Sequence, residues 1–449
     1  MWLGFGARRD VESFIRRTGG NANVLFRRFQ SKRCVVAFTY QQDQLHCDGV
    51  SLAELADEVG TPFYCYSAAA IRERFGAYRA QFGADDLVCY AVKANSNQAV
   101  LRLLAGLGAG ADVVSGGELR RALMAGIPPE RIVFSGVAKT ADEMRYALEN
   151  GIFQFNVESE PELEQLDRVA RSLDRQAPVA FRINPDIDAR THEKITTGKS
   201  VNKFGVPARR ALEAYARAAA LPGIRVQGIA THIGSQLTEL EPFEQAFRCH
   251  AELCRSLRAA GHAISVLDVG GGLGIDYHDG GARPPALADY ATLARRILDP
   301  LGCRILIEPG RSVVGEAGVL VSSVIYVKEG EKVRFLIIDA GMNDLLRPSL
   351  YGARHEIAPL RRTDGPLRRC DVVGPICETG DTFARGLELP ELQAGDRVAI
   401  GNAGAYGAVM ASTYNTRPLV PEVLVDGGRG RIVRRRVAAA DLIALDMMD

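Results

Sequence analysis

The sequence contains few lysines and no clear signal for a metal, a membrane or a nucleic acid. Only eight of its 55 basic residues are lysine, and one of them, Lys93, follows the apolar run of VCYAVKANSN, residues 88–97. The nine cysteines include no CxxC and no zinc-like pairing with histidine, which favours reduced thiols in a cytosolic setting. No apolar run approaches the roughly 20 residues of a membrane-spanning helix. A net charge of +1 gives no electrostatic case for binding nucleic acid or a membrane surface.

The bulk composition indicates a soluble globular protein with two domains. Hydrophobic residues make up 47% and charged residues 24% of the 449 positions. The first 35 residues differ, because eight arginines and lysines face only Asp10 and Glu12. Such a leader could be an organellar transit peptide, but it is poor in serine. We expect residues 1–37 to be a disordered extension, or to follow from a start codon chosen too far upstream.

Short apolar runs alternate with helix-period segments from residue 87 onward. The runs are LVCYAV (87–92), ADVV (111–114), IVFSG (132–136), FQFNV (153–157), VAFRIN (179–184), GIATHIG (228–234), VLDVGGG (266–272) and RILIEPG (304–310). In the segments between them, such as TADEMRYALEN, apolar residues recur at spacings of three and four after Ser, Thr or Asp caps. Eight such repeats predict an α/β fold, a (β/α)₈ TIM-like barrel over residues 67–315. An open doubly wound sheet is the alternative.

The pattern changes after residue 315. Runs such as GVLVSSVIYV and KVRFLIIDA are of β type and are separated by Gly, Pro and Asp turns. They predict a second, mostly β domain over residues 316–449. Residues 38–66 contain a short helix and strands, and we expect them to pair with this late domain because chain termini often lie close together.

Every predicted barrel strand ends in polar or glycine residues, and in such barrels these ends form the active site. The end residues are Lys93, Asp112, Ser115, Ser135, Asn156, Glu158, Arg182, Asn184, His232, Ser235, Gly270–Gly272 and Glu308–Arg311. The run GGGLG by itself indicates only a tight turn, which needs glycine. A second glycine turn with an arginine follows the last strand, however, where such barrels commonly bind phosphate. Together the two turns predict a phosphate site.

A lysine, a phosphate site, a histidine and a carboxylate at one barrel mouth suggest pyridoxal 5'-phosphate (PLP). Lys93 would form the Schiff base, and Glu308 would keep the pyridine nitrogen protonated. His232 could stack on the ring. Simpler alternatives remain open, because His232 could be a satisfied core histidine and Glu308 could pair with Arg311.

Eight motifs in order carry a resemblance to a known family. YAVKANSN, DVVSGGEL, FSGVAKT, THIGSQ, DVGGGLGI, EPGRS, GPICETGD and GAYG resemble the fold-type III, PLP-dependent group-IV decarboxylases, and most of all their diaminopimelate decarboxylase branch. The resemblance runs from about residue 38 to the end. It implies an alanine-racemase-like barrel with a second β domain. It also implies a homodimer in which a Cys–Glu pair from one subunit reaches the site of the other.

The resemblance assigns a role to each motif residue. Lys93 would be the Schiff-base lysine, His232 would stack on the ring, and Cys377 would deliver a proton to Cα after CO₂ leaves. The cofactor would be bound by Lys93, His232, Asp112, Ser235, Gly272, Glu308, Gly310, Arg311 and Tyr406. The substrate would be bound by Arg311, Arg347, Tyr351, Glu378 and Tyr406. Taken outside the motifs, Cys377 could be a small buried hydrophobe, Arg347 and Tyr351 could cover a turn, and Glu378 could be solvated surface.

The residue after the cysteine separates the possible substrates. Ornithine-type relatives usually carry Asp there, facing a bare amine, whereas this chain has Glu378, and Arg347 with Tyr351 supplies a carboxylate clamp. Arginine suits that task because its planar fork binds a carboxylate bidentately. The implied substrate is meso-2,6-diaminopimelate, which would lose CO₂ at its D centre to give L-lysine. An ornithine- or arginine-type decarboxylase is the alternative; a non-catalytic PLP-binding regulator would be expected to lack Lys93 or Cys377.

Overall fold

A closed barrel forms the larger part of the molecule. The computed structural model describes residues 37–188, 197, 203–278 and 282–447, so the predicted N-terminal extension lies almost wholly outside the described residues. The barrel strands are β5 (Leu87–Ala91), β6 (Gly110–Val113), β7 (Ile132–Phe134), β8 (Gln154–Val157), β9 (Ala177–Asn184), β11 (Ile224–Ala230), β12 (Val266–Asp268) and β13 (Arg304–Ile307). All run parallel, and β13 pairs with β5, which closes the sheet. The predicted barrel is confirmed and the open doubly wound sheet is excluded.

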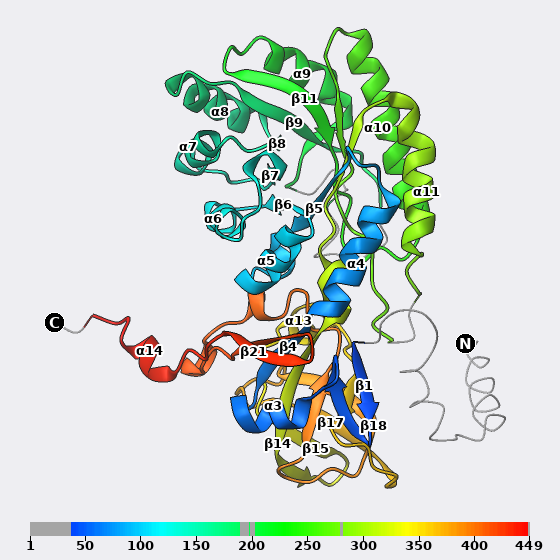
Figure 1. Ribbon diagram of the computed structural model, residues 1–449, viewed down its shortest axis with the longest axis vertical. Helices are drawn as coiled ribbons and strands as arrows, with labels where there is room; N and C mark the ends of the chain where they lie inside the picture. The colour runs from blue at the N-terminus through cyan, green and yellow to red at the C-terminus, as the bar shows by residue number, and fades with distance from the viewer. Residues whose placement is uncertain (1–36, 189–196, 198–202, 279–281, 448–449) are drawn as a thin grey trace, which may run out of the picture.

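Helices surround the barrel in the upper half of Figure 1. They are α4 (Ala68–Gln81), α5 (Gln98–Gly106), α6 (Gly116–Met124), α7 (Ala141–Asn150), α8 (Glu160–Ser172), α9 (Ala211–Ala219), α10 (Glu241–Ala259) and α11 (Leu287–Leu298). The first five begin at a side chain that accepts a backbone N–H of the first turn: Ser67, Asn97, Ser115, Thr140 and Ser159. The helices α5 to α8 each follow a barrel strand, so their caps turn the chain at the strand ends that face the site, whereas α4 follows a strand outside the barrel.

The lower half of Figure 1 is a mostly β domain. Its strands are β14 (Gly318–Glu329), β15 (Arg334–Ile338), β16 (Ile357–Pro359), β17 (Leu367–Val373), β18 (Thr382–Pro390), β19 (Arg397–Ile400), β20 (Glu422–Asp426) and β21 (Arg429–Arg434). An early strand, β4 (Phe63–Ser67), pairs antiparallel with β14 and parallel with β20. The described chain therefore contributes β4 to this domain, crosses into the barrel and returns.

Smaller elements complete the two parts. A three-stranded sheet of β1 (Phe38–Gln41), β2 (Gln44–Cys47) and β3 (Val50–Ser51) precedes α3 (Leu52–Val59) and touches the late domain through a bridge from Gln44 to Arg361. The short β10 (Val206–Pro207) adds to β9 at one end. α12 (Arg311–Val314) lies on the path from the barrel to the β domain, α13 (Arg347–Tyr351) follows β15 within that domain, and α14 (Ala439–Ile443) is the last helix of the described chain.

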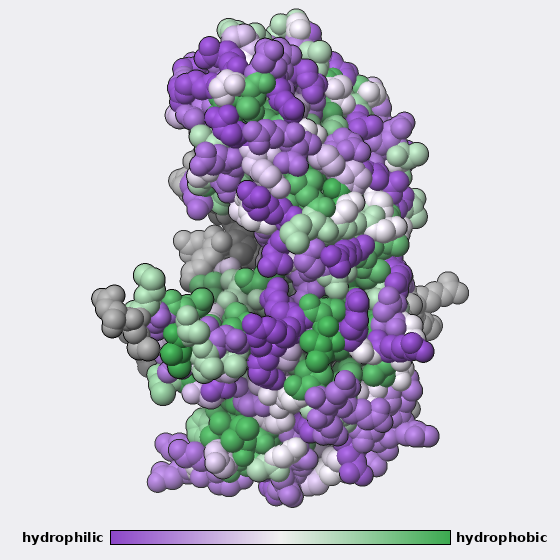
Figure 2. All heavy atoms as spheres, turned by 60° about the vertical axis from the view of Figure 1, so that its left-hand side comes forward, coloured by the Kyte–Doolittle hydropathy of each residue, from purple (hydrophilic) through white to green (hydrophobic). Residues whose placement is uncertain are grey.

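The surface alternates between polar and apolar regions. In the face shown by Figure 2, hydrophilic residues dominate the barrel at the top, while groups of hydrophobic residues gather around the waist and over the lower domain. Within the described ranges, no helix combines the length and the apolar character that crossing a membrane requires.

Candidate active site

Lys93 stands at the C-terminal end of the first barrel strand. It follows β5 in a short 3₁₀ turn, η2 (Val92–Ala94), and 34% of its side chain is exposed. Its Nζ donates a hydrogen bond to Oδ2 of Asp112, a fully buried residue of β6. Burial by itself would lower the pKa of Lys93, but the negative charges of Asp112 and Glu308 raise it above its ordinary value. The ammonium is therefore paired, and it faces a cavity of about 500 Å³.

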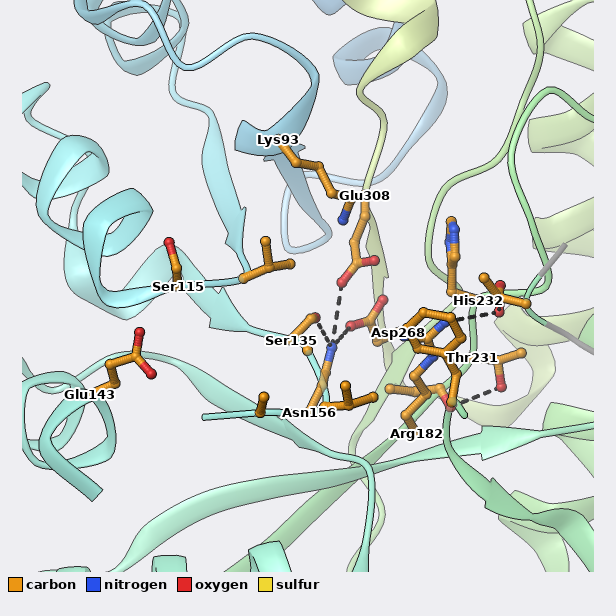
Figure 3. Close-up of a pocket in the computed structure, with 17 residues that line it drawn as sticks. Lys93, Ser115, Ser135, Glu143, Asn156, Arg182, Thr231, His232, Asp268 and Glu308 are labelled. Atoms are coloured by element: carbon orange, nitrogen blue, oxygen red, sulfur yellow. Dashed lines mark hydrogen bonds between the residues drawn. The ribbon is translucent and has the colours of Figure 1, made fainter. Parts of the chain in front are cut away.

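Carboxyl groups and an amide line the deep side of this cavity (Figure 3). Asn156, on β8, donates from Nδ2 to Asp268 Oδ2 at 2.7 Å, to Ser135 Oγ at 3.1 Å and to Glu308 Oε1 at 3.4 Å. Burial raises the pKa of Asp268 to about 6 and that of Glu308 well above its usual value. Among the described residues Glu308 forms no ion pair with Arg311, so that alternative is excluded.

His232 follows β11 at the cavity wall (Figure 3). Its Nδ1 accepts the backbone N–H of Gly271 at 3.2 Å, which places the proton of the neutral ring on Nε2. Burial, and then the positive charges of Arg182 and Lys93, lower the pKa of His232 well below its usual value. Thr197 Oγ1 donates a hydrogen bond to the backbone carbonyl oxygen of His232 at 2.8 Å. The imidazole is thus neutral at pH 7 and offers a flat face beside Lys93.

A narrow recess adjoins Lys93 and His232. It is lined by all five residues predicted to hold a phosphate: Ser235, Gly272, Gly310, Arg311 and Tyr406. Gly272 has a φ of +112°, and a Cβ there would come within 2.5 Å of the Gly234 carbonyl oxygen. A Cβ on Gly310 would meet the Cβ atoms of Ala91 and Ala94 at 3.0 Å. At both positions only glycine lets the backbone come this close to its neighbours and line the recess.

Two arginines contact the ring of Tyr277, and one of them, Arg311, also lines the recess. Arg311 donates from Nη1 to Tyr277 Oη at 2.6 Å and from Nη2 to Ser235 Oγ at 3.0 Å. The guanidinium of Arg347 lies 5.3 Å from the centroid of the Tyr277 ring and 5.7 Å from that of Tyr351. Both arginines are buried. Arg311, Arg347 and Tyr351, which the sequence predicts to bind the substrate, therefore lie close together around Tyr277.

Cys377 and Glu378 lie apart from this assembly. Both are exposed, on the turn between β17 and β18, and Glu378 accepts a hydrogen bond from Tyr414 Oη at 2.6 Å. Neither residue lines the cavity or the recess at Lys93. The exposure excludes the interpretation of Cys377 as a buried hydrophobe. A single chain does not bring its own Cys–Glu pair to Lys93.

Sequence reasoning assigns no role to several residues that the structure places at the site. The position of Asp268 could be recognised from the sequence, because this residue ends a barrel strand two positions before the glycine turn. Asn156 carries the same signal at the end of β8. Tyr277 and His355 lie in loops and have no such signal, since only the fold brings these loops to the arginines.

Comparison with known proteins identifies the family. Residues 68–315 match the model of the pyridoxal-dependent decarboxylase, pyridoxal binding domain. The chain is 50% identical over 413 residues to the diaminopimelate decarboxylase of Zymomonas mobilis, covering 91% of this chain and 98% of that one. It is also 50% identical over 408 residues to the enzyme of Pseudomonas aeruginosa, with the same coverage. This chain belongs to the diaminopimelate decarboxylase family.

The structural comparison agrees with this assignment. The crystal structure of diaminopimelate decarboxylase from Helicobacter pylori, complexed with L-lysine, matches with a TM-score of 0.84 at 46% identity, over 88% of this chain and 98% of that one. As a member of the diaminopimelate decarboxylase family, the protein is an enzyme that depends on pyridoxal phosphate. No group of His, Cys, Asp or Glu in the described part of the chain could hold a metal ion.

The residues of the site fit pyridoxal phosphate. Lys93 is the one lysine that lines the cavity, among those described, and the glycine-bordered recess adjoins it. Oδ1 of Asp112 is buried and has no hydrogen-bond partner within the described structure, so a polar group can be received there. Glu308 is a buried carboxyl with a raised pKa, which suits a proton shared with a ring nitrogen.

Proposed function

We propose that this enzyme decarboxylates the D centre of meso-2,6-diaminopimelate, releasing CO₂ and L-lysine, the last step of lysine biosynthesis. The observation that carries the proposal is the pair of buried guanidiniums, Arg311 and Arg347, which have no carboxylate partner among the described residues. A substrate with a second carboxylate at its far end supplies the missing anion. Ornithine and arginine have no such group. The names of the curated relatives support the same substrate.

The roles of the residues follow from their chemistry. Pyridoxal phosphate, when bound, supplies a conjugated ring that accepts the electron pair of the broken Cα–carboxylate bond. Lys93 holds the cofactor through Nζ, and Glu308 holds a proton at the ring nitrogen. His232, being neutral, stacks against the ring without competing for that proton. The phosphate is bound by Ser235, Gly272, Gly310, Arg311 and Tyr406, with Asp112 orienting Lys93.

The distal end of the substrate is held through both of its charged groups. Arg311, Arg347 and Tyr351 bind its distal carboxylate, with Tyr406 closing the site. Glu378 binds the distal ammonium, and Cys377 Sγ gives the proton that replaces CO₂ on Cα. Because Cys377 and Glu378 are exposed and lie outside the cavity of their own chain, we infer that they act in the site of a second subunit of a homodimer.

We place the enzyme in the cytoplasm. All eight cysteines in the described part of the chain are free thiols, which is typical of a reducing compartment.

A substrate panel tests the proposal. Purified holoenzyme should release CO₂ from meso-diaminopimelate, with stoichiometric L-lysine, and should leave ornithine and arginine unchanged at the same concentrations. Equal turnover of ornithine would contradict the substrate assignment. Absence of CO₂ release from all three, with the cofactor bound, would contradict the proposed activity itself.

A further inference from the structure

Two guanidiniums, that of Arg311 at the recess and that of Arg347 beside Tyr277, are buried without an acidic partner among the described residues. Arg311 is 5% exposed and Arg347 is 6% exposed. The Nε atom of each is buried and has no hydrogen-bond partner within the described residues. A buried cation is strongly destabilised unless it is paired, so both groups are arranged for an anion that comes from outside the chain.

Tyr277 is the side chain that both arginines share. Its Oη accepts a hydrogen bond from Arg311 Nη1 at 2.6 Å, and its ring centroid lies 5.9 Å from the Arg311 guanidinium and 5.3 Å from that of Arg347. A ring face attracts cations at such distances. Tyr277 thus contacts both positively charged guanidinium groups with a neutral side chain.

The hydroxyl of Tyr277 can also donate a hydrogen bond. It accepts from Arg311, and among the described residues no acceptor receives its own hydrogen. A phenol can donate and accept at once. A carboxylate at this position would instead neutralise Arg311 and weaken any anion site. A tyrosine accepts a hydrogen bond from Arg311 without neutralising its positive charge. Its hydroxyl also adds one more hydrogen-bond donor for an anion.

His355 fixes the ring of Tyr277 from the β domain. The two rings meet edge to face, with centroids 5.3 Å apart at 80°. His355 Nδ1 bonds the carbonyl oxygen of Gly401 at 2.8 Å, so Nδ1 is the donor and the ring is anchored to the backbone. Burial, followed by the charges of Arg347 and Arg311, lowers the pKa of His355 to about 4, so it adds no third cation at neutral pH.

We propose that Tyr277 is a specificity-determining residue of this enzyme. Its hydroxyl donates a hydrogen bond to the distal carboxylate of the substrate, and to the same carboxylate when it remains on the product. Its ring keeps Arg311 and Arg347 turned toward that carboxylate. His355 is a positioning residue that acts through Tyr277. The inference rests on the proposed function, because it assumes a ligand with a carboxylate at this end.

The test compares two ligands that differ only in that carboxylate. L-lysine and pentane-1,5-diamine are titrated into the PLP-loaded enzyme by calorimetry. Tyr277→Phe is expected to weaken L-lysine binding about tenfold, the usual effect of losing a hydrogen bond to a charged group. Binding of the diamine should stay within about twofold, because it makes no use of the clamp. For meso-diaminopimelate, KM should rise while kcat changes little.

Two further variants keep the outcome interpretable. Tyr290→Phe removes the hydroxyl of another buried tyrosine, on α11, and should leave both affinities as they are in the unaltered enzyme. His355→Gln keeps the Tyr277 hydroxyl but removes the ring behind it, and should lower L-lysine affinity about threefold with the diamine unaffected. It also provides the test should Tyr277→Phe fail to fold.

Different results would overturn the role of Tyr277 and the proposed function. An equal change for both ligands in Tyr277→Phe, or no change for L-lysine, would overturn the role of Tyr277 while the unaltered enzyme still decarboxylates meso-diaminopimelate. Absence of that decarboxylation in the unaltered enzyme would overturn the proposed function instead.

Discussion

Asp268 and Glu308 accept hydrogen bonds from a single amide, Nδ2 of Asn156, inside the barrel mouth (Figure 3). Burial raises the pKa of both carboxyls because desolvation disfavours the charged form, and the negative charges of Asp112 and Asp268 raise that of Glu308 further. The pair therefore retains a proton at a pH where ordinary carboxyls have lost theirs. Both carboxyls line the cavity that Lys93 faces, where the proposed function would use such a proton at the ring nitrogen of the cofactor.

Replacing Glu308 with Gln is expected to reduce kcat about 100-fold or more, because the preorganised partner of the ring nitrogen is lost. Single-turnover CO₂ release measures the effect, and the absorbance of bound cofactor reports occupancy. The matched control is Glu329→Gln, since Glu329 is exposed at the end of β14 and lines neither the cavity nor the recess. A kcat within about twofold of the unaltered enzyme would contradict the assigned role.

Mixing two inactive variants tests the shared active site. Lys93→Ala and Cys377→Ala should each be inactive alone. After subunit exchange of equal amounts, about one quarter of the original sites should be intact, because half of the dimers are mixed and each mixed dimer has one unaltered site. Recovered CO₂ release measures this fraction. No recovery, with exchange verified by labelled subunits, would show that Cys377 acts within its own chain or not at all.

Lys139 should contribute to stability and not to chemistry. Its buried Nζ donates to Glu162 Oε1 and to the carbonyl oxygens of Gly136 and Asn156, each at 2.7 Å. Lys139→Met leaves the Glu162 carboxylate buried and unpaired, which should lower the free energy of unfolding by about 3–5 kcal/mol.

Urea denaturation measures this loss. The double variant Lys139→Met with Glu162→Leu removes both charges and should recover part of the loss. A single variant that is destabilised by less than about 1 kcal/mol would contradict the prediction.

The buried histidine His250 predicts an acid sensitivity of the fold. It is 2% exposed, its Nε2 bonds Thr231 Oγ1 at 2.9 Å, and burial lowers its pKa from 6.5 to about 4. Between these two values the unfolded chain binds the proton and the folded chain does not. The free energy of unfolding should therefore fall as the pH drops from 6.5 to 4, by at most about 1.4 kcal/mol per pH unit from this residue.

His250→Gln keeps a donor for Thr231 and should flatten this pH dependence relative to the unaltered enzyme. Denaturation at several pH values between 4 and 7 provides the comparison. Identical slopes for the two proteins would show that His250 does not titrate between these values on unfolding.

Much of the site could be predicted because it lies at strand ends. Lys93, Asp112, His232 and Glu308 each follow a short apolar run, and a parallel barrel brings all such ends to one rim. The order of these residues along the chain was then enough to infer that they lie close together in the fold. Asp268 obeys the same rule, because it is the last residue of β12.

The arginine clamp could not be derived in this way. Tyr277 lies in a loop after β12, His355 in a loop of the β domain, and Arg347 on a helix between the two. No periodicity connects them, and their contacts arise only when the β domain folds against the barrel.

The sequence by itself determined the barrel, the lysine at its mouth and the order of the motifs, since these depend on local patterning and on the geometry of parallel strands. Only the tertiary structure decided which arginines are buried without a carboxylate, which tyrosine joins them, and that Cys377 faces outward. Whether a side chain is buried or paired depends on segments that are far apart in the chain. The interaction energy of a charge becomes large only after folding has excluded water from around it.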